Sequence, residues 1–351
     1  MNIYEKLMKK CFSLAKKSKG KNLPNPYVAA IVYDEDENKI ISEGYHHKFG
    51  SIHAEVDAIN NAGGNTINKT LIVNLEPCSH YGKTPPCTDL IIKSKIKKVV
   101  FAHFDPNKNV HGEKILKQNG IEVISGILEK EAKDLNKIFI KNQTQKKPYI
   151  MLKTATTQDS KIALLNGNSK WITNELSRKY VHKLRNEYCA IMTGAGCVKK
   201  DNPYLTSRIK NSKNPIRIIF DPNNKLDLSY NVFCDDNTPI FWVNNSNIKT
   251  PNHIQKLNFK DISTLLTELY QKGIYSIMIE AGKGLNSLLL NLGEVDEINH
   301  FIAPKIFGSG INFIETEEIF QIKDAIELYD IKTKKFGDDI LINAKIKKEK
   351  K

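Results

Sequence analysis

The sequence is poor in cysteine and lacks any long apolar run. Its 351 residues contain six cysteines, in a number and spacing unlike the dense disulfide framework of a small secreted domain. No window approaches the roughly 20 apolar residues that a membrane-spanning helix needs. The N-terminal stretch MNIYEKLMKKCFSLAKK mixes charged residues among its apolar ones, which is unlike a signal peptide. We therefore expect a cytoplasmic protein whose thiols are metal ligands or core residues.

Acidic side chains are in the minority. The chain has 53 Lys and Arg against 39 Asp and Glu, and its formal net charge is +14. Such a charge would suit a nucleic-acid or membrane-surface binder. The lysines are scattered, however, and no long basic block is interleaved with aromatic residues. We therefore predict no nucleic-acid or membrane partner. We expect the scattered positive charges to lie on a solvated surface. A positive surface would also attract a phosphorylated small-molecule substrate.

The chain is long for a single core, and its pattern predicts two α/β domains. Its hydrophobic content of 40% is ordinary for a globular protein. The first half alternates strands with helices, which predicts a mostly parallel sheet covered by helices. The polar stretch KNQTQKKP interrupts this alternation, so we place a boundary near Lys146, with domains at 1–146 and 147–351.

In the first half, strands are expected at 27–34, 71–76, 97–105 and 121–128, and helices at 3–15, 53–64, 89–96, 112–120 and 129–143. In the second half, strands are expected at 148–156, 190–196, 215–221, 239–245, 276–282, 297–304 and 338–347, and helices at 174–188, 261–273 and 284–293.

A candidate metal site lies in the first half. His53, Cys78 and Cys87 supply one imidazole and two thiols, and three protein ligands leave a fourth position open for water. Zinc lowers the pKa of such a water to about 7. Glu55, two residues from His53, is placed to move protons, as the non-ligand Glu does in zinc deaminases. The pattern therefore predicts a zinc-dependent deaminase acting on an aminopyrimidine-like ring.

Other interpretations of this pattern remain open. His80 would complete a purely structural zinc site, although such a site has no use for Glu55. The residues do not by themselves distinguish zinc from iron. Eight residues separate Cys78 from Cys87, which departs from the PCxxC spacing of generic base deaminases.

Longer motifs resemble one family along nearly the whole chain. The stretches NPYVAAIV, GYHHKFGSIHAE, EPCSHYGKTPPC and DPNKNVHGEKILKQNGIEV are similar to the deaminase half of the bifunctional deaminase–reductases of riboflavin biosynthesis. The later stretches KTATTQDSKIA, SKWIT, GAGCVKKDNPYLTSR and EAGKGL resemble the reductase half in the same order. In that family the wider cysteine spacing is the rule.

This resemblance implies a cytidine-deaminase-like three-layer α/β domain followed by a dihydrofolate-reductase-like α/β domain. It also implies two reactions. The first is hydrolytic deamination of 2,5-diamino-6-ribosylamino-4(3H)-pyrimidinone 5′-phosphate, and the second is NADPH-dependent reduction of the ribosyl side chain to ribityl. Zn²⁺ and NADPH are the implied cofactors. The sequence does not reveal the oligomeric state, and a homo-oligomer is expected because exposed interfaces are common in such enzymes.

The resemblance also assigns site residues. His53, Cys78 and Cys87 would bind the metal, and Glu55 would be catalytic. The deaminase substrate would contact Asn25, His46, His80 and Lys83. The reductase substrate would contact Lys153, Ser169, Arg185, Leu205, Arg208 and Glu280. The cofactor would contact Thr156, Trp171, Cys197, Asp201, Gly282, Lys283, Gly284, Leu285, Asn286, Ser287 and Leu288.

The chain departs from the family at three positions. Ser160 and Ala30 stand where glycine is usual, and Cys197 stands where threonine is usual. Bulkier side chains at close backbone approaches weaken cofactor binding. A deaminase whose reductase half has degenerated is therefore one alternative. A nucleoside or tRNA deaminase of the same fold is another, which the net charge would suit. The reductase-like second half argues against an RNA editor, which has no use for hydride transfer.

Overall fold

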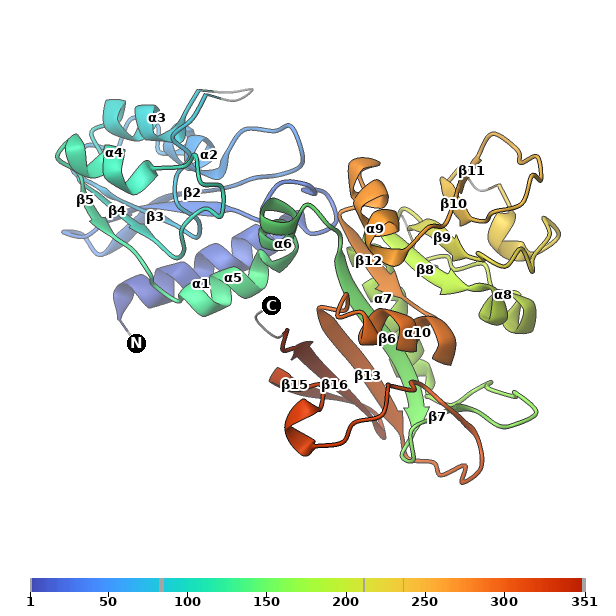
Figure 1. Ribbon diagram of the computed structural model, residues 1–351. Helices are drawn as coiled ribbons and strands as arrows, with labels where there is room; N and C mark the ends of the chain where they lie inside the picture. The colour runs from blue at the N-terminus through green and yellow to red at the C-terminus, as the bar shows by residue number, and fades with distance from the viewer. Residues whose placement is uncertain (1, 82–84, 211, 236, 349–351) are drawn as a thin grey trace. The chain divides into compact units, whose positions relative to one another are not determined.

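The computed structural model describes residues 2–81, 85–210, 212–235 and 237–348. The chain divides into two compact units, Met1–Lys146 and Lys147–Lys351, and each is described by itself (Figure 1). Among the described residues, no helix combines the length and apolar character needed to cross a membrane.

The first unit is built on one five-stranded sheet in the order β2-β1-β3-β4-β5. The strands are β1 Ala29–Asp34, β2 Lys39–Tyr45, β3 Thr70–Val73, β4 Lys98–Phe101 and β5 Glu122–Ile124. The helices are α1 Ile3–Ala15, α2 Ala54–Asn61, α3 Cys87–Lys93, α4 Gly112–Gln118, α5 Glu129–Leu135 and α6 Lys137–Gln145, with a 3₁₀ turn η1 at Lys16–Ser18. Strands β3, β4 and β5 are parallel.

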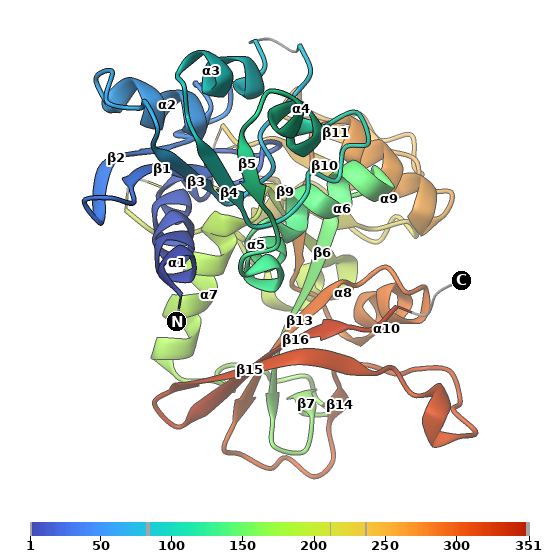
Figure 2. The ribbon, with the colours of Figure 1, turned by 90° about the vertical axis from the view of Figure 1, so that its left-hand side faces the viewer.

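Helices cover both faces of this sheet. On one face, Met8 of α1 and Ala132 of α5 pack against Ile31 and Ile72. Helices α2, α3 and α4 lie on the other face (Figure 2). They pack against the side chains that alternate with these, including Val32 and Leu71. The burial of all six residues of β1 follows from this double cover. The unit therefore has three layers.

The expected mostly parallel sheet needs a correction in this unit. Strand β1 is antiparallel to both of its neighbours, β2 and β3. The sequence analysis missed β2 because its residues show no clean alternation. The helix expected at 129–143 is also two helices. Asn136 separates them, and its amide bonds the backbone N–H and C=O of Tyr27 at 2.8 and 3.2 Å.

The second unit contains a nine-stranded sheet in the order β11-β10-β9-β8-β12-β6-β13-β16-β15, and a two-stranded sheet β14-β7. The strands are β6 Tyr149–Thr157, β7 Lys161–Ala163, β8 Ala190–Gly194, β9 Ile216–Phe220, β10 Ile240–Val243, β11 Ile254–Leu257, β12 Ser276–Ile279, β13 Glu297–Ala303, β14 Ile311–Asn312, β15 Leu328–Phe336 and β16 Asp339–Ile346. The helices are α7 Glu175–Glu187, α8 Ala195–Asp201, α9 Ile262–Gln271 and α10 Lys283–Asn291, with 3₁₀ turns η2 Asn231–Phe233 and η3 Ile322–Asp324.

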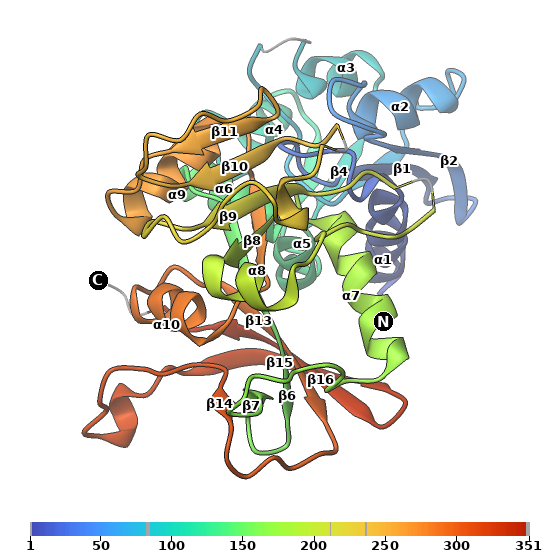
Figure 3. The ribbon, with the colours of Figure 1, turned by 90° about the vertical axis from the view of Figure 1, so that its right-hand side faces the viewer.

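The strands from β11 through β13 in the sheet order given above are parallel to one another. Strand β16 is antiparallel to β13, and β15 is antiparallel to β16 at one edge of the sheet (Figure 3). Helices α9 and α10 pack on one face through Leu266 and Leu289, and α8 packs on the other through Val198. The carboxyl ends of β6, β8 and β12 lie next to one another, which is where parallel sheets usually build their sites.

Two of the unusual residues can now be placed. Ser160 has φ +64°, a left-handed conformation in which glycine is favoured. Ala30 is fully buried in β1 and packs in the core against α2 and α3. Strands β7, β11, β14 and β15 and helix α8 were not expected from the sequence.

Candidate active sites

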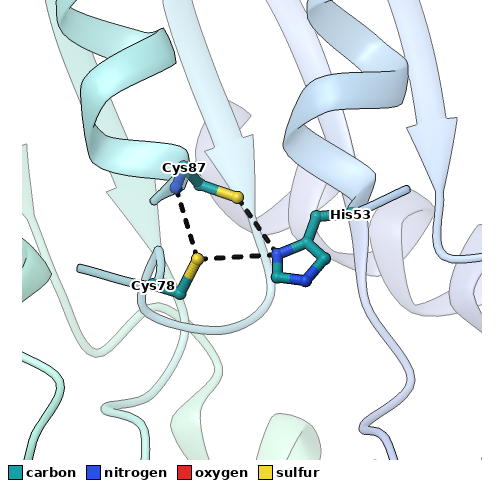
Figure 4. A group of neighbouring side chains, drawn as sticks. All are labelled: His53, Cys78 and Cys87. Carbon is teal, nitrogen blue, oxygen red and sulfur yellow. Dashed lines mark hydrogen bonds between the residues drawn. The ribbon is translucent and has the colours of Figure 1, made fainter. Parts of the chain in front are cut away.

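Three different elements bring the candidate metal ligands together. His53 is the residue before α2, Cys78 lies in the loop after β3, and Cys87 is the first residue of α3. His53 Nδ1 is 3.2 Å from Cys87 Sγ and 3.5 Å from Cys78 Sγ (Figure 4). All three ligand atoms lie within 4.8 Å of one another. One nitrogen and two sulfurs at this spacing fit a zinc ion.

Hydrogen bonds within this cluster favour a thiolate at Cys78. Hydrogen bonds from Cys87 and from His53 lower the pKa of the Cys78 thiol to about 4, so that a thiolate forms at neutral pH. The backbone N–H of Cys87 donates to the same sulfur at 3.3 Å. Burial, and then the Cys78 charge, raise the pKa of Glu55 to about 7. A carboxyl group with such a pKa can both accept and release a proton near neutral pH.

A pocket opens beside this cluster. His53, Glu55 and Cys78 line it, and so do three residues expected to bind the deaminase substrate, Asn25, His46 and His80. Lys83 lies outside the described residues.

Asn25 and His46 form a defined pair in this pocket. Asn25 Nδ2 is 3.0 Å from His46 Nε2, and His46 Nδ1 is 2.9 Å from the Ile52 carbonyl oxygen. The carbonyl requires a proton on Nδ1, so Nε2 accepts from the Asn25 amide. No donor from the described part of the chain reaches the Asn25 amide oxygen, which can therefore accept from a ligand N–H group.

A second pocket lies in the second unit. It is lined by ten of the expected reductase residues, namely Lys153, Ser169, Trp171, Arg185, Cys197, Asp201, Leu205, Arg208, Glu280 and Gly282. These residues come from β6, the loop before α7, α7, α8, the loop after it and the end of β12.

Glu280 organises the centre of this pocket. Its two oxygens accept from Arg185 Nε at 2.6 Å and Arg185 Nη2 at 2.9 Å. Lys153 Nζ is 3.8 Å from the same carboxylate. Although burial opposes it, the positive charges of Arg185 and then Lys153 lower the pKa of Glu280 to about 2. Burial lowers the pKa of Lys153. An amine of reduced basicity beside a fixed carboxylate can exchange protons with a substrate.

Comparisons with known proteins decide the family. Residues 148–342 match the model of the RibD C-terminal domain, and residues 1–103 match the cytidine and deoxycytidylate deaminase zinc-binding region. The chain is 42% identical to the riboflavin biosynthesis protein RibD of Aquifex aeolicus over 95% of this chain and 96% of that protein. The chain belongs to the RibD family. The RibD protein of Escherichia coli is 35% identical over 87% of this chain and 89% of its own length.

Solved RibD structures confirm the fold. A diaminohydroxyphosphoribosylaminopyrimidine deaminase/5-amino-6-(5-phosphoribosylamino)uracil reductase from Thermotoga maritima superposes with a TM-score of 0.89 and 39% identity, covering 98% of this chain and 99% of that one. RibD of Acinetobacter baumannii gives a TM-score of 0.86 at 32% identity, over 99% of each chain. The expected two-part α/β fold is confirmed. The chain is a bifunctional deaminase and reductase of riboflavin biosynthesis, with zinc and NADPH as cofactors.

Some expected RibD cofactor residues lie outside the lining of the second pocket. Thr156 is buried in β6, and its hydroxyl bonds the Thr157 carbonyl at 2.9 Å and His300 Nε2 at 2.7 Å. Residues 283–288 form the first turns of α10, where Leu285, Asn286 and Ser287 are buried. Nothing lies within 4 Å of a Cβ built at Gly284, which leaves that backbone open to close approach. An open backbone at the start of a helix is a place where a phosphate group can bind.

Sequence reasoning missed several residues of the first pocket of this RibD chain. Glu76, Asp105 and Asn107 also line it. Glu76 accepts from the backbone N–H groups of Asp105 at 3.2 Å and Glu113 at 3.1 Å, so it holds the 105–113 segment against the pocket. Burial raises the pKa of Asp105 to about 6. Glu76 belongs to the stretch EPC, and Asp105 and Asn107 belong to DPN. Both stretches resemble the family, but the resemblance assigned these three residues no role in the pocket.

Proposed function

We propose that residues 1–146 remove the 2-amino group of 2,5-diamino-6-ribosylamino-4(3H)-pyrimidinone 5′-phosphate by hydrolysis. The observation that carries this proposal is the pocket in which Glu55, the His53–Cys78–Cys87 cluster and the Asn25–His46 pair meet. The Thermotoga maritima relative bears the name of this deaminase. His53, Cys78 and Cys87 hold zinc, which when bound makes a water acidic enough to attack at neutral pH.

The other residues orient the ring and move protons. The Asn25 amide oxygen accepts from a ring N–H, and the His46–Ile52 hydrogen bond fixes the orientation of the pair. Glu55 takes one proton of the attacking water and passes it to a ring nitrogen. It then takes the proton of the new hydroxyl group on the ring carbon and gives it to the amine, which leaves as ammonia while the C=O bond forms. Its burial suits this role because a carboxyl with a pKa of about 7 both accepts and releases a proton near neutral pH. His80 and Lys83 bind the phosphate.

For residues 147–351 we propose reduction of the ribosyl chain of the deaminated product. NADPH supplies the hydride when bound, with Thr156, Trp171, Cys197, Asp201 and residues 282–288 as its contacts. Ser169, Arg185, Leu205 and Arg208, which line the second pocket, are assigned to the substrate. Lys153 and Glu280 hold the ribose and exchange a proton as the sugar ring opens, which their contact supports.

The same proposal covers partners and location. We assign a cytoplasmic enzyme with small-molecule substrates and no nucleic-acid partner. We also assign a homo-oligomer, because β15 forms an edge of the large sheet and leaves most of its residues exposed. Tyr329 is 50% exposed and Ile331 is 60% exposed on this strand, and apolar edge strands are normally covered.

A coupled assay on zinc-analysed protein tests both reactions. The diaminopyrimidinone phosphate should release ammonia without NADPH, and NADPH should be consumed only after deamination. Consumption of NADPH on the undeaminated substrate would contradict the assumed order, and absence of ammonia release would remove the deaminase assignment.

A further inference from the structure

The second pocket carries an excess of positive charge. Five cationic side chains line it, Lys153, Lys170, Arg178, Arg185 and Arg208, against the two carboxylates Asp201 and Glu280. A pocket with this balance suits an anionic ligand. Arg185, Lys153 and Arg178 differ in how much of their hydrogen-bonding capacity the protein already uses.

Arg185 is already occupied. Its Nε and Nη2 donate to Glu280, and its Nη1 donates to the Thr206 carbonyl at 2.9 Å. Lys153 approaches the same Glu280 carboxylate. Both cations therefore offset a buried carboxylate and fix the backbone near Thr206. A guanidinium binds phosphate well because it can donate two parallel hydrogen bonds. In Arg185 these two donors already bind Glu280.

Arg178 is held in place but still has donors to offer. It lies on α7, and its guanidinium carbon is 4.7 Å from the centre of the Trp171 ring. Its Nη1 donates to the Thr173 carbonyl at 2.6 Å. Among the residues that the structure describes, its Nε and Nη2 donate to no protein acceptor. Two contacts thus fix a half-buried guanidinium, which lowers the entropy lost when a ligand binds.

We propose that Arg178 binds a phosphate monoester in the second pocket, with the Ser169 hydroxyl lining the same space. The inference rests on the proposed reductase function and adds a ligand-binding residue to it. Two sources carry this chemistry, the 5′-phosphate of the pyrimidine substrate and the 2′-phosphate of NADPH. Trp171 acts as the platform that orients Arg178, since a guanidinium stacks favourably on an indole face.

The test uses the full chain and three variants. Arg178→Met removes the charge and keeps an unbranched stem over Trp171, and Arg178→Lys keeps the charge without the fork. Lys179→Met is the matched control, because Lys179 is 68% exposed and pairs with Glu175 at 2.9 Å on the outer side of the same helix. The KM is measured for the deaminated substrate, for its dephosphorylated form, for NADPH and for NADH.

Loss of a charged hydrogen bond to phosphate should raise the KM of one phosphate-bearing ligand about 10- to 100-fold in Arg178→Met. The KM of its dephosphorylated counterpart should change less than twofold. A shift in the substrate pair assigns the 5′-phosphate, and a shift in the NADPH and NADH pair assigns the 2′-phosphate. Arg178→Lys should fall between Arg178→Met and wild type. Equal shifts for phosphorylated and dephosphorylated ligands, or no shift relative to Lys179→Met, would overturn the proposal.

A binding measurement separates this inference from the reductase function. Calorimetric titration of the full chain with inorganic phosphate should show about one site fewer per chain in Arg178→Met than in Lys179→Met. A wild-type chain that consumes no NADPH would contradict the proposed function, whereas an active wild type with unchanged Arg178→Met phosphate stoichiometry and KM values would contradict only this inference. Thermal unfolding and Trp fluorescence of each variant verify that α7 and Trp171 stay in place.

Discussion

Replacing Glu55 with Gln tests the proton-transfer step in the first pocket. The side chain is buried, with 4% of its surface exposed, so a substitution of equal size avoids a cavity. Glutamine cannot take a proton from the attacking water or return one to the leaving amine. The proposed ligands His53, Cys78 and Cys87 are unchanged, so the zinc content should stay near one per chain.

The expected loss is large. A positioned general acid–base contributes about 10²- to 10⁴-fold in rate, which is about 2.7–5.4 kcal/mol in barrier height. Glu55 serves both proton transfers of the proposed cycle, so we expect the upper part of this range. Ammonia release is measured with the diaminopyrimidinone phosphate, and zinc is measured on the same preparation.

The chain provides its own controls for this variant. NADPH consumption with the already deaminated substrate should be unchanged, because that reaction uses the second pocket. Asp57→Asn removes a carboxylate from the same first turn of α2, where Asp57 accepts from the Tyr45 backbone N–H at 3.0 Å, and it should keep most deaminase activity. Deamination by Glu55→Gln within tenfold of wild type would refute the assigned role.

Three further predictions concern stability. Glu280→Gln leaves the buried cations Arg185 and Lys153 without their carboxylate and should cost about 3–5 kcal/mol. Because the pKa of Glu280 falls to about 2 from its ordinary 4.5, this difference should be full above pH 4.5 and shrink as the pH falls toward 2, as urea unfolding can show. Gly44→Ala places a Cβ 2.2 Å from the Ala58 backbone nitrogen on α2, so it should cost about 1–3 kcal/mol and lower the zinc content, and an unchanged melting temperature would contradict this. Ser160→Gly relieves a side chain at φ +64° and should raise the unfolding free energy by about 1 kcal/mol. A denaturation midpoint at or below that of the wild type would contradict this.

Much of the fold followed from local pattern, and the exceptions have identifiable causes. Buried strands such as β1 and β12 are continuous apolar runs that a sequence shows directly. Strand β2 alternates weakly, because Gly44 lies against the backbone of α2 where a side chain would not fit. The break at Asn136 depends on hydrogen bonds to Tyr27, which is 109 residues away in the chain. Contacts of that kind have no local signature.

The site residues also fall into two groups, those that the sequence predicted and those that only the structure reveals. His53, Glu55, Cys78 and Cys87 stand out because few other reactions need these residue types together. Glu76 and Arg178 were missed because their roles appear only when distant backbone groups or rings are placed beside them. The bidentate pairing of Arg185 with Glu280 joins residues 95 positions apart, so the sequence alone presented Arg185 as an unengaged guanidinium.

The metal cluster has a consequence for the unfolded chain. His53 and Cys87 are 34 positions apart, and a metal held by both closes the intervening chain into a loop in the manner of a covalent cross-link. By the loop-closure relation used for disulfides, a link of this span removes chain entropy worth about 4 kcal/mol from the unfolded ensemble. The ion then has a second effect besides its role in the reaction. It cross-links the start of α2, the loop after β3 and the start of α3, as a disulfide bond could do in an oxidising environment. Withholding zinc would therefore lower the stability of residues 1–146 by an amount of this order, in addition to stopping the reaction.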